Sequence, residues 1–283
     1  LMAQRNNLLS ILTSPWKCLE KQNSFKIINQ FTLIKLPIKF PLMTKARLSL
    51  RGIHKNMGGK NILSNISFSI DTKEIIGLLG PNGAGKTTAF YIAAGLLAPD
   101  KGTIEINGQD VSSLPMHLRS RAGLSYLPQE SSIFQDLTVK ENLNGIAELT
   151  MISDDDRQKF LDMTITEFNL TNILNHKGRM LSGGQRRKVE IARALACNPK
   201  ILLLDEPFAG IDPIAIEEIK NLLNQIVKKD IAILITDHNV RETLNLCNRA
   251  IIMDSGKVIA EGSANQLIAN DLVKKTYFGN MYR

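Results

Sequence analysis

The sequence has no hydrophobic run long enough to cross a lipid bilayer, which takes about 18 or more mostly apolar residues. Its most apolar region, Ile75 to Ala98, is interrupted by Pro81, Lys86 and several glycines. We therefore expect any role at a membrane to be that of a peripheral partner.

Cysteine is scarce. The three cysteines, Cys18, Cys197 and Cys247, are odd in number and far apart. This pattern offers neither the close spacing of a metal site nor a disulfide framework. It favours a reducing compartment.

Composition is that of an ordinary globular protein, with 43% hydrophobic and 22% charged residues and no internal repeat. The net charge of +8 is compatible with nucleic-acid binding, but it is unevenly placed. Residues 1–42 carry six basic residues and one acidic residue, a net of +5, which leaves +3 for the rest. We expect no nucleic-acid partner.

Residues 1–42 mix polar and isolated apolar residues without periodicity. One interpretation is an upstream extension, disordered or produced by a misassigned start site. The other is a targeting leader around Leu8–Leu12, but this apolar part is short and lacks a small-residue cleavage site. We predict a dispensable extension.

From Ala46 onward, short apolar strands alternate with helical segments. Residues 47–53 and 62–70 alternate in polarity like strands, 75–79 forms a short buried strand, and 86–97 is predicted as a helix. Residues 138–180 lack strand-like runs and predict a helical insert. Alternating strands and helices of this kind indicate an α/β fold with a mostly parallel sheet.

A glycine-rich segment, Gly80-Pro81-Asn82-Gly83-Ala84-Gly85-Lys86-Thr87-Thr88, fits the pattern G-x-x-x-x-G-K-[ST]. It follows a strand and opens a helix, the context in which backbone N–H groups cradle phosphates. Lys86 would reach the β- and γ-phosphates, and Thr87 would bind Mg²⁺. The alternative is a simple glycine-rich turn.

Two acids end the apolar strand Ile201–Leu204. Carboxylates at the carboxyl end of a buried strand face the crevice where ligands bind. Asp205 would complete the Mg²⁺ shell, and Glu206 would polarise the attacking water. Alone, this pattern also fits a strand that ends in solvated acids.

A second glycine turn, Leu181-Ser182-Gly183-Gly184-Gln185, precedes a basic helix. Glycines before a helix make an N-terminus that accepts anions. A second phosphate-binding turn suits a site shared by two copies of the chain. Alternatively, Ser182 simply caps the helix.

Together, the glycine-rich segment, the second glycine turn and the acidic strand resemble, in order and spacing, the ATP-binding-cassette (ABC) ATPases. The resemblance covers about residues 44–265. It implies a P-loop NTPase core with an antiparallel β subdomain and an α-helical subdomain at about 138–180. We expect an ATPase domain over 43–265 and a short C-terminal extension over 266–283.

The resemblance also implies a set of site residues that bind ATP and Mg²⁺. Gln129 matches the family's Q-loop glutamine, Ala209–Asp212 its D-loop, and His238 its switch histidine, which joins Glu206 in catalysis. Met57 takes the place of the aromatic residue that stacks on adenine, and a thioether stacks less well. The implied nucleotide contacts are Met57, Gly80, Pro81, Asn82, Gly83, Ala84, Gly85, Lys86, Thr87, Thr88, Gln129, Ser182, Gly183, Gly184 and Gln185; the implied Mg²⁺ contacts are Thr87, Gln129 and Asp205.

In this family, two copies bind head to tail with each ATP between the P-loop of one and the second glycine turn of the other. The resemblance therefore implies a homodimer that works with membrane permease subunits. A coupling helix of the permease would dock between the Gln129 loop and the helical insert, near Ile133, Phe134 and Leu137. Phe134 equally fits the core of its lobe.

Several segments, among them Tyr126–Glu130 and Asp205–Pro213, resemble the lipopolysaccharide-export branch of the family. That branch implies a location on the cytoplasmic face of the inner membrane. The alternative is a branched-chain amino-acid importer, whose motifs are similar. Soluble cassette proteins of translation or DNA repair usually carry two cassettes or long inserts, which this chain lacks. Intact Lys86, Glu206 and His238 disfavour a non-enzymatic nucleotide sensor.

Overall fold

The computed structural model describes residues 48–151 and 153–279. They belong to one compact unit of the chain, Lys45–Arg283. The predicted extension over residues 1–42 lies outside the described residues. Within the part that is described, no helix is both long and apolar enough to span a membrane.

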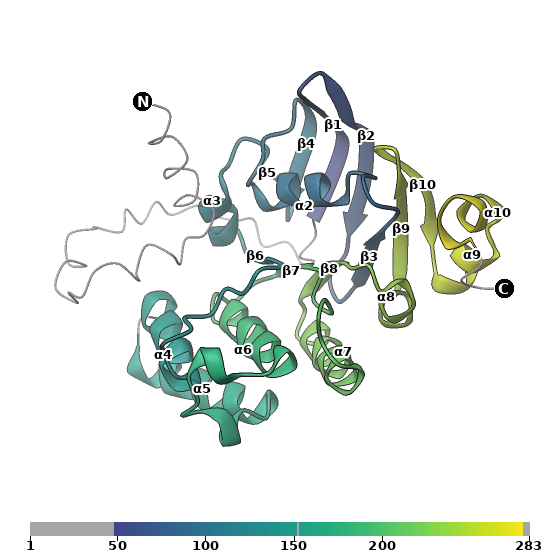
Figure 1. Cartoon of the computed structure of the whole chain (residues 1–283). Helices are drawn as coiled ribbons and strands as arrows, with labels where there is room; N and C mark the ends of the chain where they lie inside the picture. Colours follow the sequence, from purple (N-terminus) through teal and green to yellow (C-terminus); the bar gives the residue numbers. More distant parts are fainter. Residues whose placement is uncertain (1–47, 152, 280–283) are drawn as a thin grey trace, which may run out of the picture. The chain divides into compact units, whose positions relative to one another are not determined.

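An antiparallel sheet of four strands has the order β2-β1-β4-β5 (Figure 1). Its strands are β1 Leu48–Met57, β2 Lys60–Ile70, β4 Lys101–Ile106 and β5 Gln109–Asp110. Gly58 and Gly59 both have positive φ, 57° and 78°, in the two-residue turn that joins β1 to β2. Left-handed conformations at both positions match the twist of a tight hairpin.

A second sheet of six strands has the order β10-β9-β3-β8-β7-β6. Its strands are β3 Ile75–Leu79, β6 Leu124–Leu127, β7 Ile201–Asp205, β8 Ala232–Thr236, β9 Arg249–Asp254 and β10 Lys257–Gly262. All neighbours pair in parallel except β10, which is antiparallel to β9. The predicted α/β fold, with a parallel P-loop sheet and a separate antiparallel sheet, is confirmed.

Hydrophobic cores cover both faces of the parallel sheet. Ile201 and Leu203 belong to a first core with the antiparallel sheet and helix α2, Lys86–Ala94. Leu202 and Leu204 face a second core built with the helices on the other side. Because successive residues of a strand point to opposite faces, a strand covered on both sides is apolar throughout.

The remaining helices of the core follow the strands. They are α3 Met116–Arg121, α6 Gly183–Leu195, α7 Pro213–Val227 and α8 Val240–Leu246. Helix α2 ends at Ala94, three residues before the predicted end at Leu97, because Gly95 adopts a left-handed C-cap with φ 81°. The fully buried Arg119 donates hydrogen bonds to the last carbonyl oxygens of α2, at Ile92 and Ala93.

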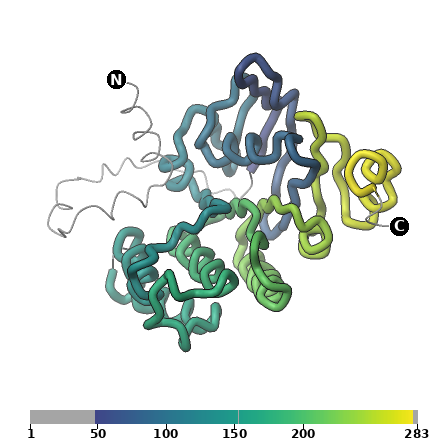
Figure 2. The backbone as a smooth tube through the Cα atoms, viewed as in Figure 1, coloured from purple at the N-terminus to yellow at the C-terminus, as the bar shows by residue number. Residues whose placement is uncertain are grey.

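The stretch predicted as a helical insert holds α4 Val139–Thr150, α5 Asp154–Glu167 and two short 3₁₀ turns, Thr171–Ile173 and Gly178–Met180. An isolated bridge between Thr138 and Lys177 brings its ends together. Figure 2 shows the chain passing from β6 into these helices and returning through α6 to β7.

At the carboxyl end, α9 Ala264–Ala269, α10 Asp271–Val273 and a π-helical turn, Lys274–Phe278, follow β10. Leu267, Val273 and Phe278 are buried in a third core with β9 and α8. This part of the predicted C-terminal extension therefore packs on the parallel sheet.

Candidate functional site

The glycine-rich segment forms the connection from β3 to α2, at the carboxyl edge of the parallel sheet. Gly80 has a φ of 149°, and a Cβ there would collide with the carbonyl oxygen of Met253. Gly83, with a φ of 78°, has no heavy atom within 4 Å of the place its Cβ would occupy. The loop is therefore packed at its base and open at its tip, as a phosphate cradle requires.

Lys86 lies beneath this loop. Its buried Nζ donates hydrogen bonds to the carbonyl oxygens of Gly80, at 2.7 Å, and Pro81, at 3.0 Å. Burial lowers the pKa of Lys86, while attraction from Glu206 and Asp205 opposes the shift. The ammonium group thus lies within electrostatic reach of both acids that end β7.

Asp205 is the last residue of β7, and its side chain is buried. The hydroxyl of Tyr126, on the adjacent strand β6, donates to Asp205 Oδ2 at 3.1 Å. Burial raises the pKa of Asp205, and the neighbouring carboxylates of Glu206 and Asp237 add to that rise. A buried carboxylate whose ionised form is disfavoured gains stability when a cation approaches.

The Glu206 side chain contacts two other residues of the predicted site. Gln129 Nε2 donates to Glu206 Oε2 at 2.8 Å, and His238 Nε2 lies 2.8 Å from Glu206 Oε1. The Glu206 backbone has a φ of 46°, and its N–H donates to the carbonyl oxygen of Thr236 at 2.8 Å. A non-glycine residue in this left-handed region is strained, and such strain concentrates at functional sites.

The second glycine turn forms the N-terminus of α6. Ser182 Oγ accepts from the Gln185 N–H, and Gln185 Oε1 accepts from the Ser182 N–H, which makes a capping box. Ser182 and Gly183 are exposed, whereas Gly184 is buried, and a Cβ there would collide with Ala215 of α7. The turn thus caps its helix and still presents two residues at the surface.

A cavity of about 150 Å³ joins the turn to the other loops of the site. It is lined by Gln129, Glu206 and Gly183, together with Ala209 and Gly210 of the predicted D-loop. Within one chain, these loops therefore border the same small space.

Asp237, which directly precedes His238, is a further polar residue of the site that the sequence motifs do not single out. Its Oδ2 accepts from the Phe208 N–H at 2.9 Å, and its Oδ1 accepts from the Asn239 N–H at 2.8 Å. The carboxylate thus ties the loop after Glu206 to the loop that carries His238. The signal that the sequence offers for it is an acidic residue just after the apolar run Ile231–Ile235, where the carboxyl end of a strand is expected.

Met57 ends β1 beside the Gly58-Gly59 turn, with 49% of its surface exposed. The structure leaves this side chain accessible.

The three residues predicted to contact a permease differ in exposure. Ile133 is buried in the second core, Phe134 is half-buried, and Leu137 is 39% exposed. The guanidinium of Arg193, on α6, lies 4.9 Å from the centroid of the Phe134 ring. Buried Asn142 holds the loop in place, donating to the carbonyl oxygens of Phe134, Leu137 and Thr138.

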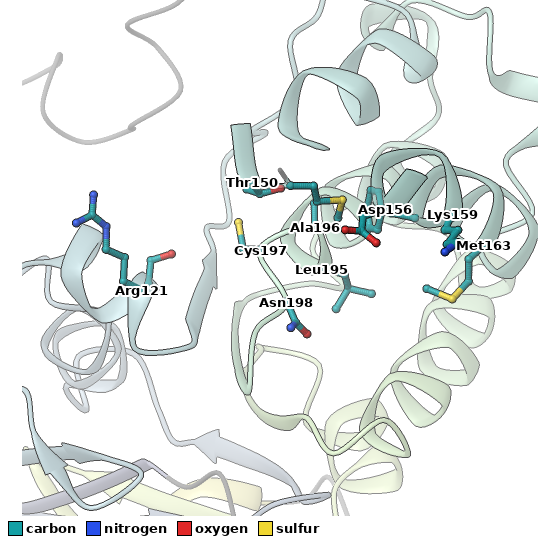
Figure 3. Close-up of a pocket in the computed structure, with 12 residues that line it drawn as sticks. Arg121, Thr150, Asp156, Lys159, Met163, Leu195, Ala196, Cys197 and Asn198 are labelled. Carbon is teal, nitrogen blue, oxygen red and sulfur yellow. The ribbon is translucent and has the colours of Figure 1, made fainter. Parts of the chain in front are cut away.

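A larger cavity of about 720 Å³ lies between α3, the helices α4 and α5, and the end of α6 (Figure 3). Arg121 borders it from α3, whereas Lys159 and Met163 border it from α5. Leu195 to Asn198, at the end of α6, complete the wall about one turn beyond Arg193.

The residues present suit ATP with Mg²⁺. The open P-loop tip and the lysine beneath it suit a polyphosphate, and the exposed Thr87 leaves its hydroxyl accessible. Among the described residues, no cluster of three or more His, Cys, Asp or Glu forms a metal site made of protein ligands alone. Mg²⁺ typically binds through one or two carboxylates plus substrate phosphates, which is the kind of site that Asp205 and Thr87 offer.

Fold and site together define a P-loop ATPase cassette. The sequence model described as "ABC transporter" matches residues 63–209. The chain belongs to the ABC transporter family, as a cassette subunit whose ATP hydrolysis is coupled to transport. Cassettes of this family dimerise and pair with permease subunits.

Curated relatives span nearly the same length. The chain is 48% identical to the lipopolysaccharide export system ATP-binding protein LptB of Haemophilus influenzae, covering 83% of this chain and 98% of that protein. It is 44% identical to the LptB of Escherichia coli K12, covering 84% and 99%. A probable ABC transporter ATP-binding protein of Azorhizobium caulinodans is 46% identical, covering 86% of each.

Solved structures give the same fold. The ADP conformation of MJ1267, an ATP-binding cassette of an ABC transporter, superposes with a TM-score of 0.74 at 27% identity, covering 83% of this chain and 99% of that one. The dimeric structure of MJ0796, a bacterial ABC transporter cassette, has a TM-score of 0.67 at 27% identity, covering 77% and 98%.

Proposed function

We propose that this chain hydrolyses ATP as a homodimer and powers the export of lipopolysaccharide from the inner membrane. It would act as a peripheral subunit on the cytoplasmic face of that membrane. The observation that carries the catalytic part is the meeting of Gln129, Glu206 and His238, from three separate loops, beside Lys86 and Asp205.

Within this proposal, each side chain of the cluster has a role that follows from its chemistry. Lys86 binds the β- and γ-phosphates once they replace its contacts with Gly80 and Pro81. Glu206 accepts a proton from the attacking water, and His238 donates a hydrogen bond to the γ-phosphate. Mg²⁺, held by Asp205, Thr87 and Gln129, would neutralise phosphate charge.

The second copy would complete the site. Ser182 and Gly183 are exposed at the N-terminus of a thirteen-residue helix, where backbone N–H groups and the helix dipole favour an anion. We propose that they bind the γ-phosphate held by the P-loop of the other copy. The remaining nucleotide contacts are the P-loop backbone from Gly80 to Thr88, with Met57 covering the adenine.

The permease would bind at the surface that continues from Leu137 and Phe134 to the larger cavity. The two regions are joined along α6, because Arg193 contacts Phe134 and the residues one turn later line the cavity. Exposed Leu137 and Met163 give this surface apolar contacts for a helix that docks in a groove.

Lipopolysaccharide is the proposed substrate because the relatives named LptB match almost their whole length at 44–48% identity. The alternative substrate is a branched-chain amino acid. Host cells depleted of this chain should stop delivering new lipopolysaccharide to the cell surface while leucine uptake continues. A plasmid-borne parent should restore delivery, and Glu206→Gln should not. Loss of leucine uptake with normal lipopolysaccharide delivery would support the importer instead.

A further inference from the structure

Tyr126 connects two strands that carry different parts of the site. It lies on β6, three residues before Gln129, and its hydroxyl donates to Asp205 Oδ2 on β7 at 3.1 Å. The strands are parallel neighbours in a register that pairs Tyr126 with Leu203 and Leu127 with Leu204. The hydrogen bond therefore depends on the strand pairing and reaches the side chain proposed to bind Mg²⁺.

The tyrosine ring is itself held in position. It packs against the first core, and its edge meets the ring of Tyr91, on α2, with centroids 6.5 Å apart and planes at 83°. Burial and the charge of Asp205 raise the pKa of Tyr126 far above the physiological range, so its hydroxyl keeps its proton. A protonated phenol on a fixed ring is a reliable hydrogen-bond donor.

We propose that Tyr126 is a positioning residue that orients the Asp205 carboxylate for Mg²⁺. This inference rests on the proposed role of Asp205. By occupying Oδ2, the hydroxyl fixes the rotation of the carboxylate and leaves Oδ1 for the metal. The same tyrosine begins the segment that leads to Gln129, so one anchored side chain of β6 connects the Asp205 carboxylate of β7 to the Gln129 loop.

The size of the effect follows from how metal sites respond to such partners. Hydrogen-bond partners of metal-binding carboxylates typically change metal affinity or activity by about 10–100-fold when they are removed. Tyr126→Phe removes the hydroxyl and keeps the ring against Tyr91. We therefore expect a loss of about 10-fold in metal-dependent nucleotide affinity and little change in folding.

The test compares two dissociation constants of a slowly hydrolysed fluorescent ATP analogue, one measured with Mg²⁺ and one in excess EDTA. The ratio of the constant in EDTA to the constant with Mg²⁺ reports how much the metal contributes to affinity, and it falls when that contribution is lost. In Tyr126→Phe, the affinity with Mg²⁺ should fall about 10-fold while the affinity in EDTA stays at the parent value. Ser125→Ala is the control, since it removes a hydroxyl from the same strand that donates to the carbonyl oxygen of Ala194 and not to Asp205; both of its constants should equal those of the parent.

The variant Asp205→Asn distinguishes a failure of the positioning role of Tyr126 from a failure of the metal role of Asp205. If Asp205→Asn lowers the ratio and Tyr126→Phe does not, the positioning role is wrong while the metal role of Asp205 stands. Equal losses with Mg²⁺ and in EDTA for Tyr126→Phe would show a merely structural role and overturn the inference. If Asp205→Asn itself keeps the parent ratio, the proposed metal role fails, and the inference fails with it.

Discussion

The guanidinium of Arg187 donates a hydrogen bond of 2.9 Å to the backbone carbonyl oxygen of Asp205. Its other terminal nitrogen, Nη1, donates to the carbonyl oxygen of Pro128 and to the carboxylate of Glu190, at 2.9 and 3.0 Å. One buried side chain of α6 thus holds the end of β7 and the start of the Gln129 loop. Glu190 in turn accepts from the Ser132 N–H.

Replacing Arg187 with methionine should destabilise the protein strongly. The change would remove the cation that donates to the Glu190 carboxylate, which is only 3% exposed, and breaking a buried ion pair costs about 3–5 kcal/mol. Urea unfolding measures this loss. Exposed Arg241→Met is the control, with an expected change within about 0.5 kcal/mol.

The double variant Arg187→Met, Glu190→Gln should recover much of the loss, because glutamine removes the charge and can still accept from Ser132. Recovery below about 0.5 kcal/mol would contradict the idea that breaking the Arg187–Glu190 ion pair causes the loss.

Asp205→Asn should stabilise the protein when no divalent metal is present. Burial raises the pKa of Asp205, so the folded state keeps this proton at pH values where the unfolded state has released it. Stability of the parent therefore falls as pH rises from about 4 through the raised pKa. The variant should show no such loss.

Thermal unfolding of the parent and Asp205→Asn in EDTA, between pH 4 and pH 8, measures this pH-dependent difference in stability. At pH 8 the variant should melt about 2–4 °C higher than the parent for each kcal/mol by which ionised Asp205 destabilises the folded parent. The melting temperatures of the two proteins should converge toward pH 4. A parent that melts at or above the variant at pH 8 would show that ionised Asp205 is not destabilising.

Glu206→Gln should bind ATP and nearly stop hydrolysis. Loss of a general base typically slows a reaction by about 100–10,000-fold. Glutamine can still contact Gln129 and His238, so the loop should keep its geometry. ATPase rates and nucleotide titration measure the two effects. Lys86→Ala is the contrast, since it should lose ATP binding itself; Glu206→Gln turning over at the parent rate would remove Glu206 from this role.

Met163→Glu should weaken binding to the permease without affecting ATP binding. The 51% exposed methionine borders the larger cavity, and a carboxylate there would lose hydration on docking. Ile214→Glu, at a residue 77% exposed on α7 and away from that cavity, is the control for permease binding. Co-purification with the membrane subunits measures the effect, and undiminished recovery with Met163→Glu would place the docking surface elsewhere.

The sequence was sufficient to predict most of the fold and the loops of the site, because these depend on local patterns. A P-loop is one continuous segment, and buried strands are short apolar runs ending in polar residues. The apolar pattern continues through Leu97 and therefore predicts the end of α2 three residues too late, although Gly95 is a readable stop signal.

Contacts between distant residues could not be predicted in this way. The Tyr126–Asp205 hydrogen bond joins residues 79 apart and exists only because β6 and β7 are neighbours. The sequence identifies the segment after the second glycine turn only as a basic helix, yet Arg187 in it is buried and donates to two backbone carbonyl oxygens. Which residues of a helix are buried depends on how it packs, and spacing alone does not fix that.

Two copies of the chain are expected to share each ATP. Copies carrying Asn82→Cys would be mixed with copies carrying Ser182→Cys, both in the Glu206→Gln background, and oxidised with or without Mg-ATP. We predict a disulfide-linked dimer of one copy of each kind, formed with ATP and absent without it or when either cysteine variant is oxidised alone. A mixture that binds ATP fully and yields no such cross-link would contradict the account.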